Sequence, residues 1–229
     1  MKDVRDRVPS QLPLPLSTRP SLSRADFVVA PANAQAVALI DAWPDWPVAQ
    51  AALHGPAGCG KTHLVAIWST LSGARVKSAS QLSVDDARAP GPLAIEDVDL
   101  AQASPGRDAA LFAALGFRAA PVLLTGRSPP FRWPWVLPDL ASRFATLTSL
   151  PLEMPDEALL ATIARKLFAD RQLLVPDAAI AQMLRLLERS PRAIREFTAK
   201  VDAVALAEGR PVNLSLVRAL LAAREGGPP

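Results

Sequence analysis

Apolar stretches alternate with helix-competent stretches over residues 25–154, and this alternation predicts strands that alternate with helices. The predicted strands are 49–54, 74–79, 92–98, 121–126 and 147–153. The predicted helices between and around them are 33–42, 62–71, 106–119 and 138–143. Strands that alternate with helices form a parallel sheet with helices on both faces. We therefore expect an α/β fold in this part of the chain.

The pattern changes on either side of this region. After Pro155 only helical stretches follow, at 156–171, 176–188, 190–206 and 213–223. The first 24 residues are rich in Pro, Ser and Arg and show no periodicity, which is typical of a flexible tail. We expect a tail at 1–24, an α/β core at 25–154 and a small all-helical lid at 155–229.

A phosphate-binding loop lies between the first predicted strand of the sheet and the helix that follows it. Its residues are Gly55, Pro56, Ala57, Gly58, Cys59, Gly60, Lys61 and Thr62. In such a loop the backbone N–H groups converge on phosphate at a helix N-terminus. Lys61 would bridge the β- and γ-phosphates, and the Thr62 hydroxyl would bind Mg²⁺. The motif predicts binding of ADP or ATP, whose shared phosphate contacts leave the working ligand open.

Two neighbouring strands carry polar side chains at their carboxyl ends, where ligands of parallel sheets collect. Glu96 and Asp97 end the strand 92–98, and we favour a Mg²⁺ site over a pair of solvated acids. Asp97 would also orient an attacking water. Thr125 ends the strand 121–126, where it could hold water or the γ-phosphate, or simply cap the strand.

Several other polar residues have less specific surroundings. Arg143 ends a short predicted helix, where an exposed arginine is the simple interpretation. Arg195 in the lid could reach back to the phosphates, whereas Arg192 can pair with a glutamate four residues on. His54 and His63 flank the phosphate loop without a cluster of metal ligands, so they do not predict a metal site.

The charge is placed unevenly along the chain. Net charge is +3 in all, with +3 on residues 1–24, −1 on 25–150 and +1 on 151–229. The nearly neutral body has no basic stripe, so we do not expect sequence-specific DNA binding by this chain alone. The chain has no run of 18 apolar residues and no secretory signal, and its single cysteine suits a reducing cytoplasm.

One segment of the tail has the features of a docking peptide. Its anchors are Gln11, Leu12, Leu14 and Leu16, and the intervening prolines hold the segment extended. From the residues alone, docking in an apolar groove of a partner and packing against its own domain are equally reasonable.

These motifs together resemble the AAA+ ATPases of the DnaA clade, and within that clade the Hda regulators. The resemblance covers nearly the whole chain. The residues that carry it are Asp26, Phe27 and Val28 of an adenine pocket, the loop through His63, and the segments 124–130, 137–144 and 193–196. The peptide at 11–16 matches the family's clamp-binding hexapeptide, and no helix-turn-helix domain follows the lid.

The resemblance implies a partner and roles for three residues. Family members bound to nucleotide and to the DNA polymerase III sliding clamp (the beta subunit) trigger ATP hydrolysis by the initiator DnaA. Arg143 matches the arginine finger, which acts on the ATP of a neighbouring protomer, and a homodimer is a further candidate assembly. Arg195 matches the lid sensor, and Thr125 matches the sensor of the fourth strand.

The chain departs from the family at two positions. Glu96 stands where the family has aspartate, and Arg127 stands where it has an acid. We therefore expect nucleotide binding with slow or negligible hydrolysis. Two alternatives remain: an active ATPase of the helicase-loader or clamp-loader type, and a clamp adaptor without catalytic effect.

Overall fold

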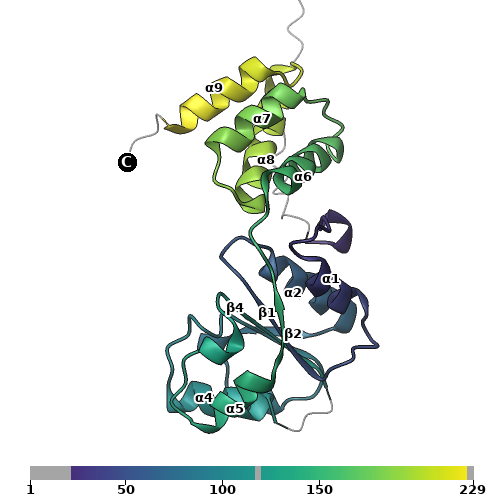
Figure 1. The fold of residues 1–229 in the computed structure, drawn as a ribbon. Helices are drawn as coiled ribbons and strands as arrows, with labels where there is room; N and C mark the ends of the chain where they lie inside the picture. The colour runs from purple at the N-terminus through teal and green to yellow at the C-terminus, as the bar shows by residue number, and fades with distance from the viewer. Residues whose placement is uncertain (1–21, 117–119, 226–229) are drawn as a thin grey trace, which may run out of the picture.

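A five-stranded parallel sheet forms the centre of the first lobe, with strand order β2-β3-β4-β1-β5 (Figure 1). The computed structural model describes residues 22–116 and 120–225. The strands are β1 (Gln50–His54), β2 (Arg75–Ser78), β3 (Leu93–Glu96), β4 (Val122–Gly126) and β5 (Thr148–Pro151). The parallel sheet predicted from the alternating pattern is confirmed.

Helices cover both faces of this sheet. Helices α1 (Ala34–Asp41) and α2 (Lys61–Ser72) lie on one face, and α4 (Pro105–Ala114) and α5 (Asp139–Thr146) on the other. Successive residues of a strand point to opposite faces, so Ala51 and Leu53 of β1 join the core under α1 and α2, while Ala52 joins the core under α4. Residues of β3 and β4 alternate in the same way between two covered faces, which explains why their sequences are nearly continuous apolar runs.

Two local features differ from the prediction. A short helix, α3 (Val84–Arg88), was not predicted; Ser83 and Asp86 form a capping box at its start, and hydrogen bonds to Ser83 and Lys77 lower the pKa of Asp86 to about 2. Helix α4 ends at Ala114, earlier than the predicted 106–119, because Leu115 already leaves helical geometry. Residues 117–119 lie outside the described part of the chain.

The second lobe consists of helices alone, as the sequence predicts. They are α6 (Glu157–Ala169), α7 (Asp177–Leu186), α8 (Pro191–Glu208) and α9 (Leu214–Glu225). They share a core of their own, in which Phe168, Met183 and Phe197 are nearly inaccessible. The Asp156 carboxylate caps α6 by accepting from the Leu159 N–H at 2.7 Å. No helix of the described residues is long and apolar enough to cross a membrane.

Candidate nucleotide-binding site

The phosphate loop follows β1 directly and leads into α2 at Lys61. The backbone is close-packed at its first residue, because a Cβ at Gly55 would lie 2.0 Å from the Leu152 carbonyl oxygen. Gly60, the last loop residue before α2, has φ +112°, a conformation that other residues rarely adopt. The glycines thus hold the strand–loop–helix turn that a phosphate requires.

Lys61 is buried within its own loop. Its ammonium donates to the Gly55 carbonyl at 2.5 Å and to the Pro56 carbonyl at 2.8 Å. These carbonyls satisfy the charge in this arrangement, and phosphate oxygens would replace them when nucleotide binds. Burial and the charge of Lys61 both lower the pKa of the nearby His54.

The predicted acids and the predicted strand sensor meet at the carboxyl edge of the sheet. Glu96 ends β3, and Asp97 follows it with φ +58°. The Asp97 N–H donates to the Thr125 hydroxyl oxygen at 3.2 Å. A hydroxyl that accepts one hydrogen bond keeps its own O–H to donate, so Thr125 can still hold a water or a phosphate oxygen.

The oxygen donors at this edge suit Mg²⁺. Thr62 in the first turn of α2 and Asp97 after β3 are exposed, and Glu96 at the end of β3 is half-buried. Hydroxyl and carboxylate oxygens are hard ligands, and Mg²⁺ is usually held by one or two such groups together with nucleotide phosphates. In the described ranges, no three His, Cys, Asp or Glu side chains gather closely enough to hold a metal ion.

Sequence reasoning missed an acid at this edge. The Asp99 carboxylate accepts from the Arg127 N–H at 2.7 Å, the Ser128 N–H at 2.9 Å and the Ser128 hydroxyl at 3.0 Å. Although Arg127 replaces the acid that the family pattern expects, Asp99 brings a carboxylate to the same turn from the neighbouring strand end. Its signal in the sequence was only an acid two residues after Asp97.

The residues predicted for the adenine pocket lie beside the loop. The ring of Phe27 packs edge-on against His63, with ring centroids 5.1 Å apart, and it lies over Gly60. Val28 is fixed through its carbonyl, which accepts from the Asn33 side chain at 3.1 Å. Burial lowers the pKa of His63, and the charge of Arg195 lowers it further, although the Ser23 carbonyl beside the ring raises it.

The lid contacts the first lobe near the site at two places, one on the phosphate loop and one on Asp26. A Cβ at Gly58 would lie 3.3 Å from Ser190, the residue that caps α8. The ammonium of Lys166 in α6 lies 3.6 Å from the carboxylate of Asp26. The first of these contacts places the N-terminus of α8 next to the phosphate loop.

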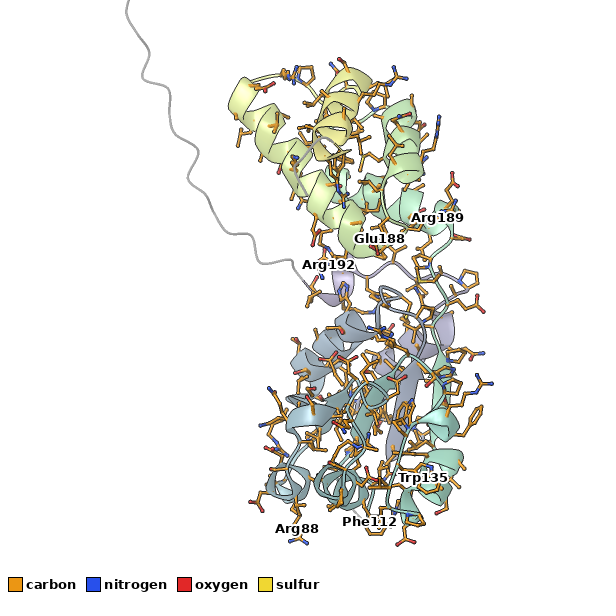
Figure 2. The ribbon with its side chains drawn as sticks, turned by 90° about the vertical axis from the view of Figure 1, so that its left-hand side faces the viewer. Arg88, Phe112, Trp135, Glu188, Arg189 and Arg192 are labelled. Atoms are coloured by element: carbon orange, nitrogen blue, oxygen red, sulfur yellow. The ribbon has the colours of Figure 1, made fainter. Side chains whose placement is uncertain are left out.

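Two arginines near the start of α8 differ in their surroundings. Arg195 is half-buried, and burial lowers its pKa, while the nearby Asp26 raises it. Arg192 is exposed and pairs with Glu196 at 2.7 Å, which is the surface pair that the spacing predicts. Figure 2 shows Arg192 at the lower end of the lid, on the opposite side of Glu188 from Arg189 in this view.

Arg143 lies near the amino ends of the strands, whereas the phosphate loop lies at their carboxyl ends. Its guanidinium donates to the Leu115 carbonyl, which also accepts from the Gln50 side chain at 3.1 Å. Gln50 begins β1, whereas the phosphate loop follows the end of that strand, about 17 Å away for a strand of this length. Arg143 therefore lies apart from the phosphate loop.

Comparison with known proteins shows the fold. No family model matches the chain, and no curated protein sequence matches it. Among solved structures, domain III of the Thermotoga maritima replication initiation protein DnaA matches with a TM-score of 0.72 and 20% identity, over 89% of this chain and 97% of that one. This likeness confirms the predicted fold class, a parallel α/β sheet covered by helices and followed by an all-helical lobe, which is the fold of that DnaA domain.

Two further matches have the same architecture. A point variant of Thermotoga maritima RuvB matches with a TM-score of 0.70 and 16% identity, over 89% of this chain and 72% of that one. A DNA replication initiation factor matches with a TM-score of 0.67 and 18% identity, over 83% of this chain and 66% of that one. The peptide at 11–16 lies outside the residues that the structure describes.

Proposed function

We propose that this chain is a nucleotide-bound AAA+ regulator that works with the DNA-loaded sliding clamp. It stimulates ATP hydrolysis by the initiator DnaA and so restrains replication initiation. The observation that carries this proposal is the place of Arg143, at the edge of the sheet opposite to the chain's own phosphate loop. An arginine there is too far from the chain's own nucleotide to contact its phosphates, but it can contact the phosphates of a nucleotide bound to a neighbouring subunit.

The chemistry of such an arginine is well defined. A guanidinium placed against a transferring phosphoryl group stabilises the charge that develops there, and in known cases this raises the rate by about 10³–10⁵. Arg143 is half-buried and faces Phe112, so its guanidinium is already held before a partner arrives. Holding the group in place beforehand reduces the entropy lost on docking.

The chain's own nucleotide has a structural task in this proposal. Lys61, Thr62 and the loop glycines bind the phosphates of ADP or ATP, and Mg²⁺ when present supplies charge neutralisation. Arg195 then joins the lid to the core through the same phosphates. Because Glu96 and Arg127 depart from the family pattern, we expect this site to hydrolyse ATP slowly.

The likeness to DnaA domain III supports the choice of partner. AAA+ subunits of similar shape can stack so that an edge of one meets the nucleotide of the next. The peptide at 11–16 supports the sliding clamp as the second partner, since spaced leucines on an extended segment suit an apolar groove. The reducing compartment expected from the single cysteine is the cytoplasm, where these partners act.

Reconstitution tests the proposal. DnaA loaded with radiolabelled ATP is mixed with this protein, ADP, and sliding clamp loaded on DNA, and conversion of the bound ATP to ADP is followed. We expect stimulation that requires the clamp and is lost when Leu14 and Leu16 are changed to alanine. Stimulation without the clamp, or none at all with intact protein, would overturn it.

The same preparation separates the two alternatives. A helicase-loader or clamp-loader ATPase would hydrolyse ATP rapidly without DnaA, and Lys61→Ala would abolish that activity. A passive adaptor would bind the clamp and DnaA without changing the rate of hydrolysis.

A further inference from the structure

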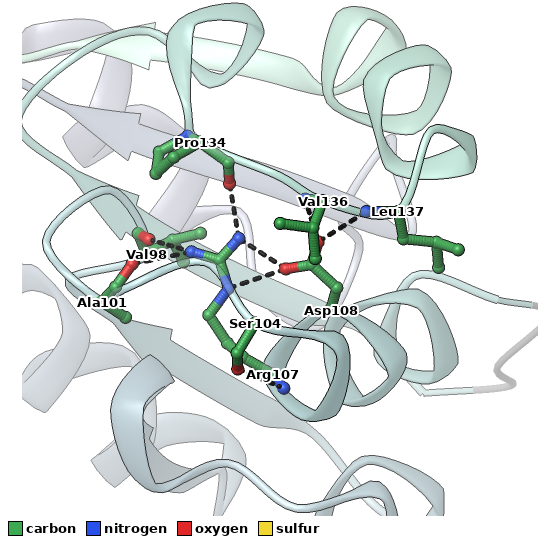
Figure 3. Close-up of polar contacts among 8 residues, drawn as sticks. All are labelled: Val98, Ala101, Ser104, Arg107, Asp108, Pro134, Val136 and Leu137. Atoms are coloured by element: carbon green, nitrogen blue, oxygen red, sulfur yellow. Dashed lines mark hydrogen bonds and ion pairs between the residues drawn. The ribbon is translucent and has the colours of Figure 1, made fainter.

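Two adjacent charged residues are buried together at the start of α4. Arg107 is 6% exposed and Asp108 is fully buried, and the guanidinium donates to the carboxylate at 2.6 and 2.9 Å (Figure 3). Adjacent charges on a helix normally point away from each other into solvent. Here both side chains turn towards the interior, where each also contacts backbone groups.

These contacts join two separate segments of the chain. Arg107 donates to the Ala101 carbonyl at 2.8 Å, in the segment that follows Asp97, and to the Pro134 carbonyl. The other oxygen of Asp108 accepts from the Val136 N–H at 2.6 Å and the Leu137 N–H at 2.9 Å. The pair thus ties the loop after β3 to the segment that leads into α5.

Arg143 is held by the same helix, α4. Asp108 fixes the backbone two residues before α5 begins, and Phe112 lies one helical turn further along α4. The Arg143 guanidinium carbon lies 4.2 Å from the centroid of the Phe112 ring. At the end of α4 the Leu115 carbonyl accepts from Arg143. One helix therefore sets both the entry of α5 and the direction of its arginine.

Stability alone does not explain this arrangement. A buried ion pair loses most of its attraction to desolvation, and apolar residues of similar size often serve stability as well or better. The five backbone groups that this pair satisfies, by contrast, fix the paths of two segments relative to each other. Such a contact set favours a geometric role.

We infer that Arg107 and Asp108 are positioning residues for Arg143, an inference that rests on the finger role given to Arg143 above. Loss of either charge frees the segment before α5, and the arginine then leaves the Phe112 ring. The pair touches neither nucleotide nor partner in this role. It acts only through the placement of α5.

The test combines a spectroscopic signature with activity. The Nε–Hε resonance of Arg143 in ¹⁵N-labelled protein is assigned from its loss in Arg143→Lys. The Phe112→Leu variant gives the chemical shift of this resonance in the absence of the Phe112 ring. In Asp108→Asn we expect the resonance to move towards the Phe112→Leu position. If Asp108→Asn fails to fold, Arg107→Lys provides a second variant, because lysine keeps the charge but lacks the several N–H donors of the guanidinium.

The matched control is Asp177→Asn, which breaks an exposed pair with Arg165 in the lid. It should leave the Arg143 resonance in place. An unmoved resonance in both Asp108→Asn and Arg107→Lys would overturn the inference.

The activity readout separates this inference from the proposed function. Stimulation of DnaA hydrolysis should fall about tenfold in Asp108→Asn, with unchanged affinity for ADP and the clamp. If the resonance moves in Asp108→Asn but Arg143→Lys still stimulates fully, Arg107 and Asp108 do position Arg143, but Arg143 is not an arginine finger. A moved resonance in Asp108→Asn with normal stimulation, while Arg143→Lys is inactive, would refute the functional part of the inference.

Discussion

The Asp97 N–H donates to the Thr125 hydroxyl oxygen at 3.2 Å, across the carboxyl ends of β3 and β4. This bond holds Asp97 in a left-handed conformation, φ +58°, that a residue with a side chain adopts at some cost. The acid beside the phosphate loop and the strand sensor are therefore one structural unit, in which a change at Thr125 displaces Asp97.

Thr125→Val removes the acceptor and keeps the shape. We expect the free energy of unfolding to fall by about 1 kcal/mol, because a hydrogen bond in a largely buried place is lost. The Mg²⁺-dependent part of the nucleotide affinity should fall as well, since Asp97 is no longer fixed. Urea unfolding and calorimetric titration measure the two effects. Thr125→Ser should behave as wild type, and equal behaviour of the valine and serine variants would contradict this assignment.

Gly126→Ala should destabilise the core. A Cβ at Gly126 would lie 2.5 Å from the indole nitrogen of Trp133, and both residues are buried. Such overpacking costs about 1–3 kcal/mol of unfolding free energy. Gly106→Ala is the matched control, because a Cβ there meets nothing within 4 Å and lies in the first turn of α4. Unfolding midpoints that fall equally in both variants would refute the packing argument.

The two arginines of α8 should differ in their effect on nucleotide affinity. Arg195→Ala removes a half-buried charge near Asp26 and His63, and we expect ADP affinity to fall by about tenfold, or about 1.4 kcal/mol. Arg192→Ala removes only an exposed ion pair with Glu196, so the affinity for ADP should be unchanged. Titration with a fluorescent ADP analogue measures both. Equal losses in the two variants would rule out a specific role for Arg195.

Stability should decrease as pH falls through 6.5. His54 and His63 are the only two histidines of the chain. Burial is the largest cause that lowers the pKa of each below the ordinary value of 6.5. The unfolded state then takes up protons at a higher pH than the folded state. Their contribution to stability is complete above pH 6.5 and is lost as pH falls through the lower, folded-state pKa values.

Urea unfolding from pH 7.5 to pH 5.5 checks this expectation. A variant with both histidines changed to glutamine should show a flatter profile over that range. An unchanged slope in the variant would mean that other groups cause the decrease.

Much of the fold followed from the sequence because its causes are local. Strand alternation and the phosphate loop both depend on residues close in the chain. Helix α3 was missed because five residues give no periodicity, although its capping box was a usable signal.

The remaining features depend on residues far apart in sequence. Arg107 and Asp108 were not singled out from the sequence, because the contacts of Asp108 that bury the pair come from the segment near residue 136. Likewise, the spacing of Lys61 predicts its phosphate role but not its present contact with the loop carbonyls. The separation of Arg143 from the phosphate loop required the sheet order.

The most direct measurement is the rate of DnaA-bound ATP hydrolysis with clamp on DNA, compared between wild type and Arg143→Ala. Arg185→Ala, an exposed arginine of the lid, is the control. We expect Arg143→Ala to bind clamp and ADP normally and to lose stimulation by about 10³ or more, while Arg185→Ala stimulates fully. Full stimulation by Arg143→Ala would contradict the finger role of Arg143.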